Sequence, residues 1–231
     1  MKSEKYLRLT DISATHTGKH LCAYDVTCEN TNTGATRTWE VISRKGSENS
    51  HKEQFHNIKE YIKTEPNASG ITILAFNKAQ DKVLLLLEYR PAIGRYVINF
   101  PQGMRKEDES SEEAAVREIV EETGCAIREI ITVKEPSYTA PGFTDDATSL
   151  VICYAYENEV MGHDAVKDKL KSTFEEIVPL WLDKTQLCDL CRGVKPNHPY
   201  WKNRPFTKIP LTMRVEMFAL GWVSSGFSLY T

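Results

Sequence analysis

Glutamates crowd one short stretch of the chain, between Gly103 and Cys125. Within it Glu118, Glu121 and Glu122 are spaced i, i+3 and i+4, which on a helix places three carboxylates on one face. Such a face is repulsive unless cations neutralise it, and carboxylate oxygens suit the hard ions Mg²⁺ and Mn²⁺. The spacing therefore indicates divalent-metal chemistry.

The residues around these glutamates predict the helix itself, over residues 111–123. Ser110 and Glu113 fit a capping box, and Gly124 fits a left-handed stop after the last turn. A helix with one apolar side can pack on a core while its other side carries charge. The apolar side here consists of Ala115, Val116, Ile119 and Val120.

The alternative interpretation of this helix is a solvated surface with ordinary salt bridges. Arg117 lies one turn from Glu113 and from Glu121, and pairing with either would orient a carboxylate while other oxygens stay available to a cation. For an isolated ExxEE pattern the surface interpretation is the commoner one. The wider spacing of the segment decides between the two.

That wider spacing is Gly103, five residues, Glu109, seven residues, and then REIVEETG from Arg117 to Gly124. The arrangement resembles the Nudix box in every fixed position. The terminal aliphatic position holds Cys125, a small hydrophobe that can pack similarly. Seven specified positions would match by chance at about one starting point in 10⁸. Coincidence therefore does not compete with the resemblance.

The resemblance implies an α/β fold, an α/β/α sandwich around a mixed sheet. It also implies hydrolysis of a nucleoside diphosphate linked to another moiety. Metal ions assist such cleavage because they neutralise oxygens that repel a nucleophile and lower the pKa of bound water. The implied metal ligands are Gly103, through its carbonyl, with Glu118, Glu121 and Glu122, and the implied supporting residues are Arg117 and Glu109.

A further carboxylate is expected to act as the general base. Adjacent acids that are coupled through a metal titrate as a group, so the sequence does not single one out. Glu121 and Glu122 are candidates within the helix. Glu175 and Glu176, in the run TFEEIV, are candidates for a base or a further metal ligand, with an edge-strand charge as the alternative.

Two other segments point to a substrate. EYRPAIGRYVINFPQG resembles the stretch of ADP-ribose pyrophosphatases in which a QYR-like sequence leads through a strand into a PAG-like turn, and APGFTDD resembles their proline–glycine loop. The resemblance implies that Arg90 contacts phosphate, a strand-end ion pair being the alternative. It implies that Phe143 stacks on adenine, unless it only packs, and that Asp145 or Asp146 lies near the terminal ribose.

Two departures from that subgroup bear on the substrate. Position 99, before the turn, is usually a glutamate in that subgroup but is Asn99 here. The turn itself reads FPQG, a form similar to the one in dinucleoside polyphosphate hydrolases. The leading expectation is Mg²⁺-dependent hydrolysis of ADP-ribose to AMP and ribose 5-phosphate, with Mn²⁺ as a possible substitute. The alternatives are an enzyme for dinucleoside polyphosphates or nucleotide sugars, and a non-catalytic module that senses a nucleotide.

The elements that must position these residues interleave strands and helices. Near-continuous apolar runs predict strands at 70–77, 82–90 and 95–100, covered on both faces. We expect residues 66–231 to form the Nudix domain. Its remaining elements are predicted as strands at 128–138, 148–157 and 175–182 and helices at 183–193 and 211–225.

The N-terminal residues 1–65 form a separate region. Residues 20–29 and 36–44 are short alternating runs joined by a polar turn, which predicts an antiparallel β ribbon. A polar connector with room for one further strand follows at 50–70. In ADP-ribose pyrophosphatases such a ribbon helps to build a dimer whose partner contributes to the substrate pocket, so the resemblance implies a homodimer.

Composition places the chain among ordinary globular proteins. Its 231 residues are 41% hydrophobic and 26% charged, and the net charge of −3 without a long basic block argues against extended nucleic acid as a partner. No stretch approaches about eighteen consecutive apolar residues, so we expect no membrane span, and a cytoplasmic location. The six cysteines are expected to be free thiols, with a zinc site at Cys188, Cys191 and His198 as a minor alternative.

Overall fold

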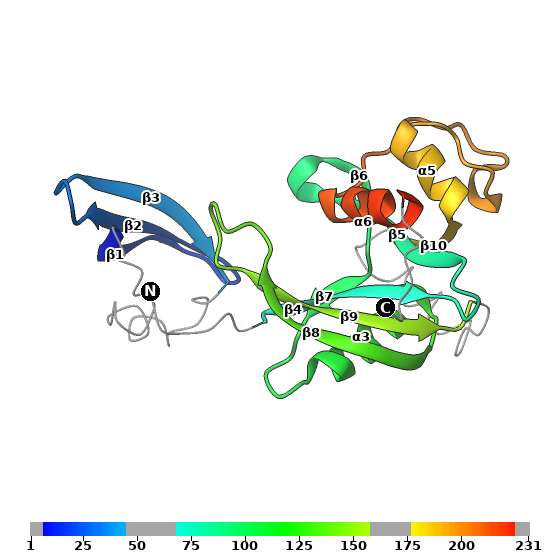
Figure 1. Cartoon of the computed structure of the whole chain (residues 1–231), viewed down its shortest axis with the longest axis horizontal. Coiled ribbons are helices and arrows are strands. Elements are labelled where there is room, and N and C mark those ends of the chain that lie inside the picture. Colours follow the sequence, from blue (N-terminus) through cyan, green and yellow to red (C-terminus); the bar gives the residue numbers. More distant parts are fainter. Residues whose placement is uncertain (1–6, 45–67, 158–176, 225–231) are drawn as a thin grey trace. The chain divides into compact units, whose positions relative to one another are not determined.

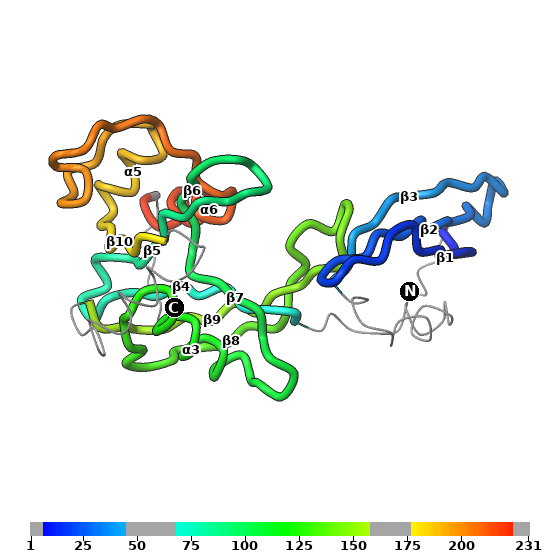
Figure 2. The backbone as a smooth tube through the Cα atoms, turned by 180° about the vertical axis from the view of Figure 1, so that it is seen from behind, coloured from blue at the N-terminus to red at the C-terminus, as the bar shows by residue number. Residues whose placement is uncertain are grey.

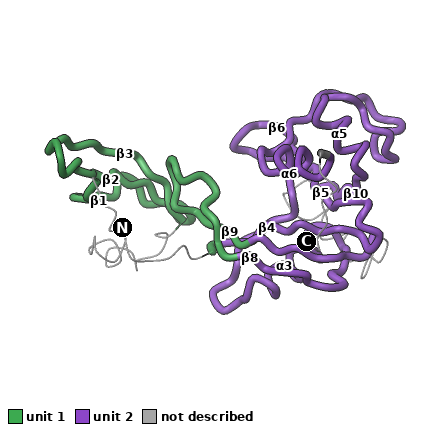
Figure 3. The backbone as a smooth tube through the Cα atoms, in the orientation of Figure 1, with its two compact units in different colours: residues 1–69, 135–149 green, residues 70–134, 150–231 purple. Residues whose placement is uncertain are grey.

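The structure is a computed structural model that describes residues 7–44, 68–157 and 177–224. It consists of two compact units (Figure 3). One unit comprises residues 1–69 and 135–149, and the other comprises residues 70–134 and 150–231. The chain therefore passes from the first unit into the second, returns to the first at residue 135, and enters the second again at residue 150.

The first unit contains a three-stranded antiparallel sheet with the strand order β1-β2-β3 (Figure 1). The two strands predicted at 20–29 and 36–44 are confirmed as β2 and β3, but the prediction missed β1. Two register irregularities interrupt β1, and almost all of its side chains are exposed, so its apolar residues do not alternate over its whole length. The strands are β1 (Leu7–Thr17), β2 (Cys22–Asn30) and β3 (Thr36–Ser43).

The second unit is built on a seven-stranded mixed sheet with the order β10-β5-β4-β9-β8; β6 pairs with β5, and β7 pairs with β4. All seven residues of β4 are buried, as are six of the nine in β5, so the prediction of central strands covered on both faces is confirmed. The strands are β4 (Gly70–Phe76), β5 (Lys82–Arg90), β6 (Arg95–Asn99), β7 (Gln102–Met104), β8 (Ile127–Tyr138), β9 (Ala147–Ala155) and β10 (Ile177–Asp183).

Helices cover both faces of this sheet, which Figure 2 shows from behind. Alternate residues of β4 point to opposite faces, so Ile71 and Ile73 belong to one apolar cluster and Leu74 and Phe76 to another. The α/β/α expectation is thereby confirmed. The helices are α3 (Ser111–Thr123), α5 (Lys184–Arg192) and α6 (Met213–Ser224), with short 3₁₀ turns η1 (Pro91–Ile93) and η2 (Pro199–Trp201).

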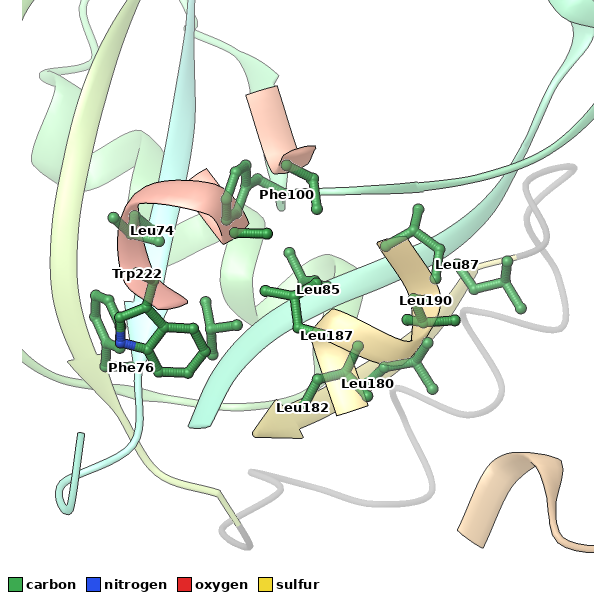
Figure 4. Close-up of a cluster of buried hydrophobic side chains, with 14 of the residues drawn as sticks. Leu74, Phe76, Leu85, Leu87, Phe100, Leu180, Leu182, Leu187, Leu190 and Trp222 are labelled. Atoms are coloured by element: carbon green, nitrogen blue, oxygen red, sulfur yellow. The ribbon is translucent and has the colours of Figure 1, made fainter. Parts of the chain in front are cut away.

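The larger cluster lies between the sheet and helices α5 and α6 (Figure 4). Trp222 of α6 is buried there; its ring stacks on Phe218, with centroids 5.4 Å apart, and meets Phe76 edge-on at 5.8 Å. Replacing such a residue by alanine costs about 3–5 kcal/mol of stability. The face opposite this cluster holds α3, so a rigid sheet supports the acidic helix.

No helix in the described ranges is both long and apolar enough to cross a membrane. The six cysteines are free thiols, as expected.

Candidate active site

Helix α3 begins and ends where its sequence predicts. The Ser110 hydroxyl accepts the Glu113 N–H at 3.1 Å, and the Glu113 carboxylate accepts the Ser110 N–H at 2.8 Å. At the other end Gly124 takes φ +69° and donates its N–H to Val120. The buried residues Ala115 and Ile119 pack toward the sheet, so the charged flank of the helix is left for the glutamates.

Arg117 is clamped between two acidic residues. Its Nε and Nη2 each lie 2.7 Å from an oxygen of Glu109, and its Nη1 lies 2.6 Å from Glu118 Oε1. The predicted pair with Glu121 is present at 3.7 Å, whereas the alternative partner Glu113 serves the helix cap instead. Hydrogen bonding by Arg117 lowers the pKa of Glu109 to about 2, with help from the Lys106 N–H. The clamp therefore ties the loop before α3 to the helix.

Gly103 lies directly against this arrangement. A Cβ atom at that position would lie 2.0 Å from both Cδ and Oε1 of Glu118, closer than any real contact. Strand β7 brings Gly103 here by pairing with β4, where Ile71 is its register partner. A glycine is needed because the backbone and the carboxylate approach each other so closely.

Glu122 sits at the inner end of the cluster. Its Oε2 accepts the Gln102 N–H at 3.2 Å. Burial and, to a smaller extent, the negative charge of Glu118 raise its pKa to about 8. The pKa of Glu118 is also raised by burial, although Arg117 opposes this. Glu118 has Arg117 as its positive partner, whereas no ion pair joins Glu122 to a basic residue among the described residues.

The donors fit a hard divalent cation, because carboxylate oxygens and a backbone carbonyl are the ligands that such ions prefer. The buried, uncompensated Glu122 supports the same interpretation. However, within the described residues no three or more His, Cys, Asp or Glu side chains already converge on one point. Glu118 is engaged by Arg117, and the Glu121 side chain is 40% exposed, so binding an ion requires their side chains to turn inward.

Near the end of β5 lies a buried carboxylate, Glu88, which the sequence analysis did not identify as a site residue. Arg90 Nη2 lies 2.7 Å from Glu88 Oε2, so the ion-pair alternative is present, while contact with phosphate stays a prediction. Asn99 donates from Nδ2 to Glu88 Oε1 at 3.0 Å. The available signal was a charged residue that directly follows a run of apolar residues in a predicted buried strand.

Phe143, Asp145 and Asp146 belong to the unit that contains the N-terminal sheet. The Ser43 hydroxyl donates to Asp145 Oδ2 at 3.0 Å, and the Ser69 hydroxyl donates to Asp146. These bonds hold the loop between β8 and β9 to its own unit. Phe143 is 56% exposed, so its ring is available to stack. Contacts of these residues with adenine or ribose stay predictions.

The candidate loop bases Glu175 and Glu176 lie outside the described residues, and so does the start of the strand predicted at 175–182. Within the described part of the chain, the remaining candidates for the general base are Glu121 and Glu122 of the acidic cluster.

Comparisons with known proteins agree with this geometry. A family model described as NUDIX domain matches residues 66–204, more than half of the 231-residue chain. The chain is 29% identical over 124 residues to putative nudix hydrolase 2 of Caenorhabditis elegans, which is 53% of this chain and 49% of that protein. It is 36% identical over 95 residues to the ADP-sugar pyrophosphatase of Mus musculus, 40% of this chain and 36% of that protein.

A third relative is the ADP-ribose pyrophosphatase of Bacillus subtilis (strain 168), 25% identical over 126 residues, which is 53% of this chain and 66% of that protein. The chain thus spans about half or less of the length of the worm and mouse relatives. Among solved structures, an ADP compounds hydrolase superposes with a TM-score of 0.60 across 97% of both chains at 17% identity. That likeness is one of fold.

Proposed function

The chain belongs to the Nudix family, and from that premise we propose that it hydrolyses the diphosphate of ADP-ribose. Water attacks one phosphorus, the bridging P–O bond breaks, and the products are AMP and ribose 5-phosphate. The names of the mouse and Bacillus relatives support an ADP-linked sugar as the substrate class. Dinucleoside polyphosphates are the second candidate, favoured by the FPQG turn.

The observation that carries the proposal is that the box folds as one unit. Arg117 holds Glu109 and Glu118 together, and the backbone of Gly103 lies against the Glu118 carboxylate. In the proposal Glu118, Glu121 and Glu122 hold Mg²⁺, with the Gly103 carbonyl as a further ligand; Mn²⁺ substitutes. When bound, the ion would neutralise diphosphate oxygens and acidify the attacking water.

The other residues have supporting roles in this proposal. Arg90, at the end of β5, binds a phosphate oxygen through its planar guanidinium. Phe143 stacks on the adenine, and Asp145 or Asp146 contacts the terminal ribose. A carboxylate of the cluster, Glu121 or Glu122, takes the proton of the attacking water.

Residues 66–231 supply the hydrolase in this proposal, and residues 1–65 form a dimerisation region that contributes to the partner's substrate pocket. The three-stranded sheet of β1, β2 and β3 suits such a role because the outer edge of β1 has no neighbour in the sheet order of the described strands, whereas the outer edge of β3 bridges to Thr144 at Ile42. Light scattering of the full chain tests this proposal. A mass of twice 26.3 kDa is expected, and a monomer at micromolar concentration contradicts it.

A substrate panel tests the activity. ADP-ribose, other nucleotide sugars and diadenosine polyphosphates are each incubated with Mg²⁺, with Mn²⁺ and with a chelator, and products are separated by ion-exchange chromatography. We expect the highest kcat/KM for ADP-ribose, equal amounts of AMP and ribose 5-phosphate, and no turnover with the chelator. Preference for diadenosine polyphosphates selects the second candidate, and tight binding without cleavage indicates a sensing module.

A further inference from the structure

Glu88 is a buried carboxylate in an otherwise apolar strand. The residues before it, 83–87, are all buried, and Glu88 itself is only 4% exposed. A buried charge costs several kcal/mol unless it is paired and hydrogen-bonded. Each oxygen of Glu88 has a different partner: Oε1 accepts from Asn99, and Oε2 pairs with Arg90. The side chain thus joins a buried amide to a guanidinium nearer the solvent.

Asn99 is oriented by a second contact. Its Oδ1 accepts the Thr212 hydroxyl at 3.1 Å, so its Nδ2 end faces Glu88. Asn99 is 5% exposed, and the Thr212 N–H donates to the Ile98 carbonyl at 3.0 Å. The amide therefore cannot turn over without losing two hydrogen bonds, and it presents a fixed donor to the carboxylate.

Arg90 is the exposed end of this chain of contacts. Its side chain is 39% exposed, and Nη2 is held 2.7 Å from Glu88, so much of the guanidinium edge faces solvent. Residues 88 and 90 lie two apart on β5 and share the sheet face of Leu84, which packs in the cluster with α3. Arg90 and the acidic helix α3 therefore lie on the same face of the sheet.

On the basis of the proposed function, we propose that Glu88 is a positioning residue which, oriented by Asn99, holds the Arg90 guanidinium ready for the diphosphate oxygens of the substrate. An arginine that is already held loses less conformational entropy when it binds phosphate. Glu88 touches no reacting atom in this role. Its contribution should appear in substrate binding, with little effect on the chemical step.

The pair also connects two features of the sequence. The segment reads EYR where the ADP-ribose pyrophosphatases that it resembles have a QYR-like sequence, and Asn99 stands where they have a glutamate. The structure joins positions 88 and 99 by one hydrogen bond. In this chain the carboxylate of that pair is at position 88, two residues from Arg90.

Three variants separate positioning from stability: E88Q, N99D and the double variant E88Q/N99D. All are close to isosteric. N99D places two carboxylates in one buried contact, which should lower the melting temperature, and the double variant returns to one carboxylate, which should restore it. Only the wild type and N99D keep the carboxylate at 88 beside Arg90.

The measurements are melting temperature, KM and kcat for ADP-ribose, and the Kd of its non-hydrolysable α,β-methylene analogue. For E88Q we expect KM and Kd to rise about tenfold with kcat within about twofold, since one charge-assisted hydrogen bond is weakened. The double variant should melt like the wild type but keep the raised KM and Kd. The proposal is overturned if E88Q leaves both constants unchanged, or if they follow the melting temperature across the four proteins.

Glu157→Gln is the matched control. Glu157 pairs with Lys82, at the opposite end of β5 from Arg90, and this change also neutralises one carboxylate of an ion pair. We expect KM and Kd to stay at wild-type values. A wild type that binds the analogue but cleaves no diphosphate contradicts the proposed activity while the Kd series still decides the role of Glu88. A wild type that does not bind the analogue overturns both.

Discussion

Glu109 and Glu122 both flank the charged side of α3, yet the pKa of Glu109 falls to about 2 whereas that of Glu122 rises to about 8. Glu109 accepts two hydrogen bonds from Arg117 and one from the Lys106 N–H. Glu122 is buried, has the negative charge of Glu118 nearby, and receives the Gln102 N–H at 3.2 Å. The outer carboxylate has its cation within the protein, and the inner one does not.

This difference separates two uses of similar residues. A carboxylate such as Glu109, whose two oxygens both accept hydrogen bonds from an arginine, fixes the local structure and has little to offer an external ion. A carboxylate that is buried without compensation gains most when a divalent cation arrives. The comparison therefore predicts that Glu122 matters most for activity, and that Arg117 and Glu109 act by shaping the loop and the helix.

The largest effect is expected for Glu122→Gln. The change removes the charge and keeps the shape, so kcat should fall by on the order of 10³-fold while the circular dichroism spectrum stays unchanged. Glu112→Gln, an exposed residue in the first turn of the same helix, is the control and should keep wild-type turnover. Near wild-type kcat in Glu122→Gln would show that the inner carboxylate is not a metal ligand.

Arg117→Lys should have the next largest effect. Lysine keeps the charge but cannot bond both oxygens of Glu109 and reach the Met104 carbonyl at the same time. We expect kcat/KM to fall about 10- to 100-fold, with a melting temperature several degrees lower. Arg192→Lys, in the last turn of α5, serves as the control. If lysine supports full activity and stability, the two hydrogen bonds between Arg117 and Glu109 are not needed for either.

Gly103→Ala tests the close approach between β7 and α3. The new methyl group would collide with Glu118, which must move away, so we expect the apparent affinity for Mg²⁺ to fall about tenfold. Gly221→Ala adds a methyl group where nothing lies within 4 Å, and it should leave the affinity unchanged. Titration of activity against Mg²⁺ concentration measures both. An unchanged midpoint for Gly103→Ala contradicts the proposed ligand arrangement.

The last expected effect concerns stability and not activity: it is a pH dependence of stability in the presence of a chelator. The pKa of Glu122 rises from 4.5 in its ordinary state to about 8 in the folded chain. Between these values the folded protein holds a proton that the unfolded chain has lost, so stability falls as pH rises, by at most about 1.4 kcal/mol per unit. Glu109 has the opposite sign: its contribution is present above pH 4.5 and is lost as pH falls toward 2.

Urea unfolding at several pH values between 5 and 8 measures this slope. The Glu122→Gln variant should show a flatter profile than the wild type, because it has no proton to bind at that position. Identical profiles for the two proteins would mean that Glu122 is ionised in the folded state even without a cation, and the contrast with Glu109 would then be lost.

The parts of the fold that the sequence predicts well depend on local signals. The limits of α3 follow from Ser110, Glu113 and Gly124, which act within a few residues of one another. Strands β4 and β5 are apolar throughout, so their burial on both faces needs no knowledge of their neighbours. The prediction that Glu118, Glu121 and Glu122 bind metal has the same basis, spacing within a single helix.

The features that were missed depend on contacts between distant positions. The contact of Glu88 with Asn99 follows from the pairing of β5 with β6, and no pattern within either strand predicts it. The bond between Ser43 and Asp145 joins residues 102 positions apart. Strand β1 was not predicted because its bulges interrupt the two-residue period on which strand prediction relies.

Strands β8 and β9 are divided between the two units, since residues 135–149 belong with the N-terminal sheet while the rest of both strands belongs to the second unit. No single cut in the chain can therefore liberate either unit intact. A fragment that starts at Gly70 would retain Asp145 and Asp146 but lack the hydroxyls of Ser43 and Ser69 that they accept from. Removal of residues 1–69, the leading sheet included, would therefore take these hydroxyl donors away from a loop that the remaining fragment still contains.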